Sequence, residues 1–237
     1  GGKVPYQVKT GWLGRGMKIA KLDGDGLALA LPMPLLLRGV PKNDNYYPAK
    51  GRLPYKEILE ILSQVYSNKS EAELKSLIDI VKSRPKMDTS YGGGSGSRNN
   101  TSLAMKAAGM MIKPNGPRVA VFEVHDFDTH SAQGGVDGTH SDCLREIDDI
   151  VGALKRYLGK DFDNTLIVTL TEFGRMIKQN SGLGTEHGYG SAVLMAGGLL
   201  KKSQVYTDWP GLNKKELFEK RDLNSTIDAR SIYASAM

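Results

Sequence analysis

Apolar residues occur along the chain in two kinds of run, and their order predicts a regular fold in the second half. The runs at 118–124, 164–171 and 191–198 are short and almost continuously apolar, which is typical of strands buried on both faces. The segments 103–113 and 139–158 instead repeat apolar residues at helical spacing. Strands that alternate with helices indicate an α/β fold, with a mostly parallel sheet covered by helices.

The first half of the chain is less regular. Residues 17–40 alternate around the turn sequence Asp-Gly-Asp-Gly, which predicts a hairpin or two strands, and 41–54 is predicted to be a loop. Two amphipathic helices are expected over 55–68 and 70–84. The second of them opens with a capping box at Ser70–Glu73.

Glycine marks two further segments. Residues 11–16, Gly-Trp-Leu-Gly-Arg-Gly, lack the preceding strand and the Lys-Ser ending of a phosphate-binding loop, so a turn is predicted there. Residues 86–102 are rich in Gly and Ser, above all at 92–97, which predicts a flexible loop. Both a natural loop and an engineered splice have this composition. The whole chain, 1–237, has the length of a single α/β domain.

The composition of the chain mainly excludes certain classes of protein and certain kinds of site. Of the 237 residues, 40% are hydrophobic and 24% charged, the usual balance of a globular protein. The longest apolar stretch, 26–37, is shorter than the roughly 20 residues that a membrane span needs, and the chain opens without a signal-peptide pattern. The single cysteine, Cys143, excludes an internal disulfide and a cysteine-cluster zinc site. The net charge is +6, but the basic residues are dispersed, so we expect no nucleic-acid partner.

Polar residues gather where the predicted strands end, and three of the four histidines are among them. Because ligands bind beyond the carboxyl ends of parallel strands, we expect these side chains to meet at one edge of the sheet. The residues are His125, Asp126, Asp128, His130, Thr171, Glu172, Arg175, Thr185, Glu186 and His187.

Imidazoles and carboxylates in such a set favour a metal site, since zinc, iron and manganese bind both. On an extended backbone Asp126, Asp128 and His130 would point to the same side. Glycines around His187 would let its loop fold closely over an ion. The alternative is a set of polar loop residues that are hydrogen-bonded to the backbone. His140, near a helix start, is expected to pack or to cap the helix.

Several sequences, taken in order, resemble the DUF1501 family of exported bacterial proteins. They are Phe-Asp-Thr-His-Ser-Ala-Gln at 127–133, the long segment 171–198, Val-Tyr-Thr-Asp-Trp-Pro-Gly-Leu at 205–212 and Ser-Thr-Ile-Asp-Ala-Arg-Ser-Ile-Tyr at 225–233. With the earlier Gly-Trp-Leu-Gly-Arg, the resemblance covers most of residues 11–237. It implies a three-layer α/β/α sandwich like that of the alkaline phosphatase and sulfatase superfamily, and an exported or periplasmic location.

The resemblance also implies a site with one or two divalent ions, zinc first, with calcium or manganese as alternatives. Asp128, His130 and His187 would hold one ion. Glu172 would reach a second ion together with an upstream carboxylate, and Arg175 would contact a small anionic ester. The expected function is therefore a metal-dependent hydrolase of phosphate or sulfate esters. The alternative is a non-catalytic exported protein that binds a metal or an anion.

Some positions depart from the family's pattern. His125 and Asp126 replace two glycines and would add potential metal ligands, and Glu186 replaces an aspartate. Asp228 and Arg230 match a late Thr-Thr-Asp-x-Arg element of the family. The family's first strand region, with its Arg-Gly-Gly-x-Asp-Gly sequence, is not found in this chain, which also ends in a predicted helix, so a fragment of the domain is expected.

Overall fold

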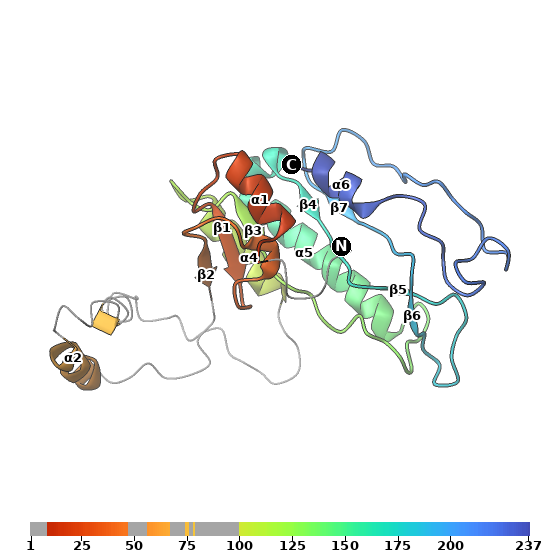
Figure 1. The fold of residues 1–237 in the computed structure, drawn as a ribbon, viewed down its shortest axis with the longest axis horizontal. Helices are drawn as coiled ribbons and strands as arrows, with labels where there is room; N and C mark the ends of the chain where they lie inside the picture. The colour runs from red at the N-terminus through yellow and green to blue at the C-terminus, as the bar shows by residue number, and fades with distance from the viewer. Residues whose placement is uncertain (1–8, 47–55, 67–73, 76–77, 79–99) are drawn as a thin grey trace. The chain divides into compact units, whose positions relative to one another are not determined.

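The structure, a computed structural model, describes residues 9–46, 56–66, 74–75, 78 and 100–237 (Figure 1). The chain divides into two compact units. One unit joins Gly1–Tyr46 to Asn99–Met237, and the other comprises Tyr47–Arg98. The residues that concern function all lie in the first unit.

Little of the second unit is described. Helix α2 (Lys56–Val65) confirms the first predicted amphipathic helix, with Leu59 buried. Of the second predicted helix, 70–84, only residues 74–75 and 78 are described, and they are helical. Its capping box lies outside the described residues.

A three-stranded parallel sheet forms the centre of the first unit, in the order β2-β1-β3. Strand β1 (Gly26–Leu29) is central and wholly buried, and it pairs with β2 (Asp44–Tyr46) and β3 (Val119–Val121). The strand predicted over 118–124 is thus confirmed, but it covers only Val119–Val121. The hairpin or two strands predicted over 17–40 are wrong, because this segment contains the single strand β1, whose two partners are parallel to it and come from other segments.

Helix α1 (Trp12–Ile19) begins where a turn was expected, so the prediction for residues 11–16 is wrong. The glycines serve close packing instead of breaking the helix. A Cβ atom on Gly14 would lie 2.1 Å from the carbonyl oxygen of Arg38, just after the short helix η1 (Leu35–Leu37). Met17, one turn further on, is fully buried.

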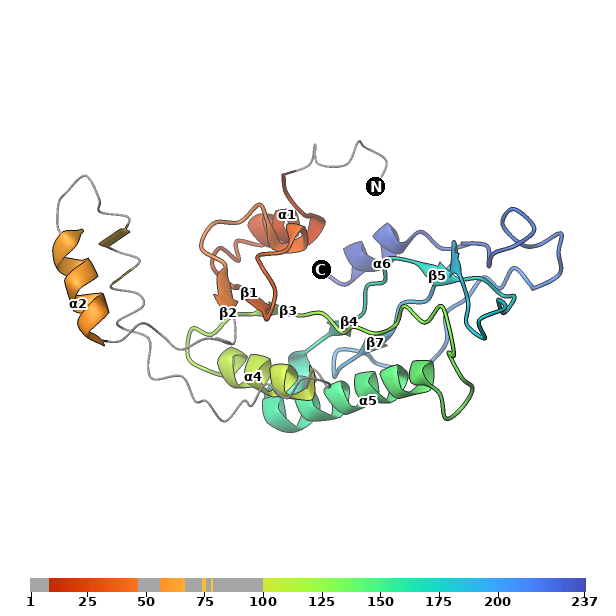
Figure 2. The same cartoon turned by 90° about the horizontal axis from the view of Figure 1, so that it is seen from below.

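Helices cover both faces of β1. Leu27 and Leu29 contact Ala107 of α4 (Asn100–Met111) on one face, whereas Ala28 packs with Met17 of α1 on the other. Figure 2 shows α1 and α4 on opposite sides of the strands. The alternation along β1 explains why its sequence is apolar at every position.

Helix α5 (Thr139–Leu158) has the predicted boundaries and packs along α4 through small and branched side chains. Gly138 precedes it, and Gly159, with φ of +56°, ends it. Helix α4 starts three residues before the predicted 103, so residues 100–102 of the predicted 86–102 loop are helical. The remainder of that loop, 86–99, lies outside the described residues.

The last predicted strands are present but shorter, and they pair differently. Strands β4 (Ile167–Val168) and β7 (Met195–Ala196) form an antiparallel pair, and so depart from the mostly parallel sheet that was predicted. A parallel pair needs a crossover, usually a helix. Here the chain between β4 and β7 instead forms the antiparallel hairpin β5 (Gly174–Arg175) and β6 (His187–Gly188).

Two short helices complete the unit. Helix η3 (Gly159–Asn164) follows α5 directly, and α6 (Ala229–Ser235) lies near the end of the chain. Tyr233 of α6 stacks on Trp12 of α1, with ring centroids 5.2 Å apart. Among the described residues, no helix is both long and apolar enough to cross a bilayer.

Candidate metal centre

The loop that follows β3 carries the first candidate ligands. Its backbone is not evenly extended, because Asp126 has φ of +72°. The carbonyl oxygen of Asp126 accepts a hydrogen bond from the Cys143 thiol of α5 at 3.4 Å, and burial raises the pKa of that thiol. Asp126, Asp128 and His130 were expected to point to the same side. Only Asp128 and His130 do so, and Asp126 lies outside the group that they form.

The hairpin β5–β6 carries the other ligand. Arg175 lies directly opposite His187 in the pair of strands. Backbone hydrogen bonds join the hairpin to the first loop, among them Ala132 N–H to the carbonyl of Gly182 at 2.8 Å and Gln133 N–H to the carbonyl of Leu183 at 2.9 Å. The two loops are therefore fixed to each other by their main chains.

A glycine allows this close approach. A Cβ atom on Gly184 would lie 2.3 Å from the carbonyl carbon of His130, which no side chain can tolerate without a shift. The side chain of Gln133 adds a further tie, since it accepts hydrogen bonds from the hydroxyls of Thr129 at 3.0 Å and Thr185 at 2.8 Å.

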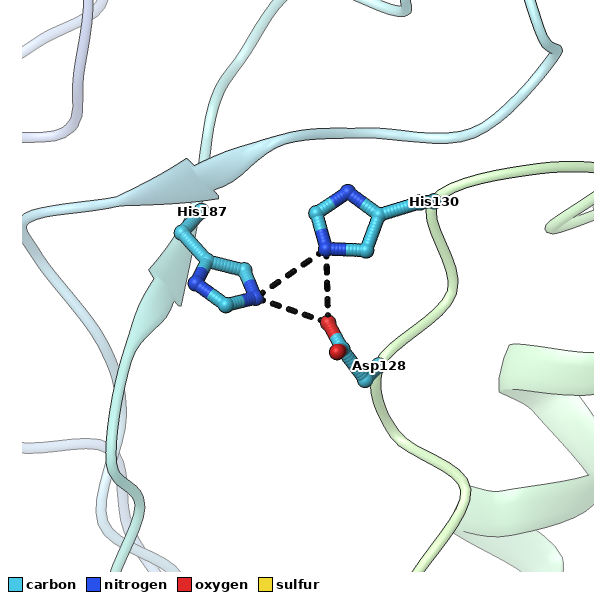
Figure 3. Close-up of side chains that lie close together, drawn as sticks. All are labelled: Asp128, His130 and His187. Atoms are coloured by element: carbon cyan, nitrogen blue, oxygen red, sulfur yellow. Dashed lines mark hydrogen bonds and ion pairs between the residues drawn. The ribbon is translucent and has the colours of Figure 1, made fainter.

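Asp128, His130 and His187 point toward one another across the gap between the loops (Figure 3). Asp128 Oδ1 lies 2.7 Å from His187 Nε2 and 2.9 Å from His130 Nε2, and the two Nε2 atoms are 3.2 Å apart. Two imidazole nitrogens and a carboxylate oxygen thus surround one point. Their side chains are between 41% and 57% exposed, so the group is open to solvent.

Two histidines and Arg175 surround the Asp128 carboxylate. The hydrogen bond with His187 lowers the pKa of Asp128, and the charges of His130, His187 and Arg175 act in the same direction. A carboxylate that stays ionised is the form that binds a metal.

Arg175 is the least exposed of these groups, at 18%. Its guanidinium donates to the carbonyl oxygens of Thr185, at 2.6 Å, and of Phe127, and it lies 3.3 Å from Asp128 Oδ1. Arg175 therefore joins the two loops behind Asp128.

Three residues around the ligands were not singled out from the sequence. Asn180 donates to Glu186 at 2.6 Å, and the ring of Phe173 stacks on that of His187 at a centroid distance of 3.8 Å. Gln133 is the third. All three lie inside the family-like segments 127–133 and 171–198, and this is the one signal that could have drawn attention to them, because single polar or aromatic loop residues leave no periodic signal.

The structure does not bring the other predicted ligands into this group. Glu172 is exposed, and His125 lies 3.6 Å from Glu123 instead. The ring of His140 packs edge-on against Phe127, in agreement with the prediction that this histidine packs or caps a helix. Its Nδ1 atom is buried without a hydrogen-bond partner. Among the described residues, only Asp128, His130 and His187 form a group of metal-ligand type.

Asp228 and Arg230 lie at the start of α6. The Asp228 carboxylate caps the helix by accepting from the Arg230 backbone N–H at 2.9 Å, and it pairs with the Arg230 guanidinium. These bonds lower the pKa of Asp228 to about 2. Their role in the structure is therefore to begin a helix.

Comparison with known proteins gives a family but no individual relative. No curated protein and no solved structure matches the chain. One family profile, described as "Protein of unknown function (DUF1501)", matches residues 8–235. This span includes the candidate ligands, the hairpin and α6, so the chain belongs to the DUF1501 family.

Proposed function

We propose that this chain is part of a metal-dependent hydrolase of phosphate or sulfate esters, with a divalent ion, zinc first, bound by Asp128, His130 and His187. The observation that carries the proposal is the convergence of two Nε2 atoms and one Oδ1 atom within 3.2 Å of one another. Two histidines and one carboxylate are a known ligand set of catalytic zinc sites.

The distances fit such an ion. At zinc bond lengths of about 2.0–2.1 Å, tetrahedral ligand atoms lie about 3.3 Å apart. The three atoms would need to separate by less than about 1 Å to reach this spacing. A cation would take the place of the hydrogens that join the Nε2 atoms to Asp128 in the metal-free chain.

Three protein ligands would leave a coordination position open, and the exposure of the group lets a solute reach it. A bound divalent ion supplies Lewis-acid stabilisation of an anionic ester and activation of water. Asp128 would balance part of the ionic charge, while Arg175 would hold Asp128 in place and add positive charge beside an anionic substrate.

The family resemblance supports the finer parts of the proposal. They are an alkaline phosphatase-like three-layer sandwich, an exported or periplasmic location, and a second ion at Glu172. That second ion would need a carboxylate from outside the present group, because Glu172 is exposed and apart from it.

Zinc titration followed by a panel of chromogenic phosphate and sulfate esters tests the proposal. We expect about one bound zinc per chain and metal-dependent turnover. His187→Ala should weaken zinc binding by more than about 100-fold, because even losing a partner behind a ligand costs roughly 10–100-fold. His125→Ala is the matched control, since that histidine lies on the loop of Asp128 and His130 but outside the group, and the variant should bind zinc like the wild type.

A second function is favoured by one observation. Among the described residues the ligands of only one ion come together, and Glu172 is not among them. A protein that binds one ion without catalysing hydrolysis would show the zinc stoichiometry and the His187→Ala effect without turnover of any ester. Absence of zinc binding in the wild-type chain would reject both functions.

A further inference from the structure

We propose that Glu186, held by Asn180, is a positioning residue that fixes the tautomer of His130 and so directs the Nε2 lone pair of His130 toward the ion. This inference rests on the proposed metal site. Glu186 stands in the hairpin next to the ligand His187, and it contacts His130 across the two loops.

The contacts of Glu186 use both carboxylate oxygens. Oε2 lies 2.9 Å from Nδ1 of His130, and Oε1 accepts a hydrogen bond from the Asn180 side-chain amide at 2.6 Å. The carboxylate thus lies against the Nδ1 edge of the imidazole, whereas the Asp128 oxygen lies at Nε2.

Asn180 is itself firmly placed. Its amide nitrogen also donates to the backbone carbonyl of His130 at 2.8 Å, and its amide oxygen accepts from the backbone N–H groups of Gly182 and Gly184 at 3.0 and 2.9 Å. Asn180 therefore holds the Glu186 carboxylate and the His130 backbone in one arrangement.

The chemistry of the groups sets the tautomer. An ionised carboxylate can only accept, so the Nδ1 atom of His130 must carry the hydrogen. Nε2 faces the Asp128 carboxylate at 2.9 Å, so in the metal-free chain it can carry a hydrogen as well. When an ion lies beside Asp128, the hydrogen on Nε2 is displaced, the hydrogen on Nδ1 stays with Glu186, and Nε2 has the free lone pair. This lone pair is directed at the point shared with Asp128 and His187, where metal ligation requires it.

The second histidine is held differently. The ring of His187 stacks on Phe173 with an angle of 8° between the ring planes. This stacking orients the plane of the imidazole, but it involves no hydrogen bond and so does not select a tautomer. The carboxylate behind His130 thus has an electrostatic role that the aromatic ring behind His187 cannot fill. It raises the basicity of the ligand as well as orienting it.

The test is Glu186→Gln, measured by zinc titration and by ¹⁵N NMR of the His130 ring in the metal-free chain. An amide can turn either its oxygen or its nitrogen toward Nδ1, so the tautomer is no longer fixed. We expect zinc affinity to fall by roughly 10–100-fold. The ¹⁵N shift of His130 Nδ1 should move away from that of a protonated nitrogen, because the hydrogen can then stay on Nε2 beside Asp128. Glu186→Asp, which keeps the carboxylate, should recover part of the affinity.

Glu123→Gln is the matched control, because Glu123 also lies beside a histidine, His125, but outside the group. It should change zinc affinity less than about twofold, well below the range expected for a partner behind a ligand. Zinc affinity of Glu186→Gln equal to that of the wild type, or an unchanged His130 tautomer, would overturn the inference while leaving the proposed function intact. Wild-type chain that binds no zinc would reject the proposed function, and the ring shifts alone would then decide whether Glu186 fixes the tautomer.

Discussion

The sheet with its helices and the pair of loops that carries the candidate ligands are held together by different forces. In the first region Met17, Leu27 and Leu29 are completely buried and contribute through the apolar area they remove from water. In the second region the candidate ligands are about half exposed, and hydrogen bonds and close glycine contacts fix the loops.

This difference separates the source of stability from the candidate metal site. Burying a polar group without a hydrogen-bond partner in an apolar core costs free energy. A catalytic metal site, in contrast, needs accessible polar ligand atoms and an open coordination position. The loops can present such atoms only because their main chains are tied to each other. Substitutions in the two regions should therefore have effects of different size on different measurements.

The largest effect is expected for Leu29→Ala in β1, which removes a fully buried side chain between the sheet and α4. The free energy of unfolding should fall by about 2–5 kcal/mol, as measured by urea denaturation. Leu183→Ala makes the same substitution on the hairpin loop, where the side chain is 62% exposed. Its free energy of unfolding should stay within about 0.5 kcal/mol of the wild-type value. Equal losses of stability in the two variants would contradict the distinction between the regions.

An intermediate effect is expected for Gly184→Ala, because the new Cβ atom would lie against the His130 backbone. Such overpacking typically lowers the free energy of unfolding by about 1–3 kcal/mol. Here the added atom should also displace His130 and weaken zinc binding. Titration with zinc and thermal unfolding measure the two effects. Gly135→Ala serves as the control, since nothing lies within 4 Å of the added atom. Wild-type zinc affinity in Gly184→Ala would show that the close contact does not position the ligand.

The smallest effect has the opposite sign. Gly152 lies in the middle of α5, and a Cβ atom added there meets nothing within 4 Å. Gly152→Ala should raise the free energy of unfolding by about 0.5–1 kcal/mol, because alanine loses less backbone entropy in a helix. Zinc affinity should not change. A coupled change in zinc affinity would contradict the independence of the helices from the loops.

Sequence patterns predicted the regions to different degrees. Helix α5 has its predicted boundaries because its amphipathic period is long and its ends are marked by Gly138 and Gly159. Helix α1 was missed because glycine, a helix breaker by propensity, is required there for contact with the Arg38 backbone. The antiparallel pairing of β4 and β7 depends on how the chain between them returns, which the apolar pattern of each strand does not contain.

The candidate site shows the same division. Asp128, His130 and His187 were predicted as ligands from their residue types and motifs, and the structure brings these three together. Asp126 is separated from them because its φ angle is positive. A positive φ angle is uncommon for residues other than glycine, so the sequence does not predict it. Asn180 was missed because its contact with His130 arises only when two distant loops meet, and its contact with Glu186 inside the hairpin leaves no periodic signal.

Arg175 has a consequence for which changes its position can accept. One terminal nitrogen donates to the carbonyl of Thr185 in the hairpin, and the other donates to the carbonyl of Phe127 in the opposite loop. Lysine carries the same charge on a single nitrogen and lacks the planar fork that spans two such acceptors. A swap to lysine would thus preserve the electrostatic balance beside Asp128 yet leave one of the two segments untethered.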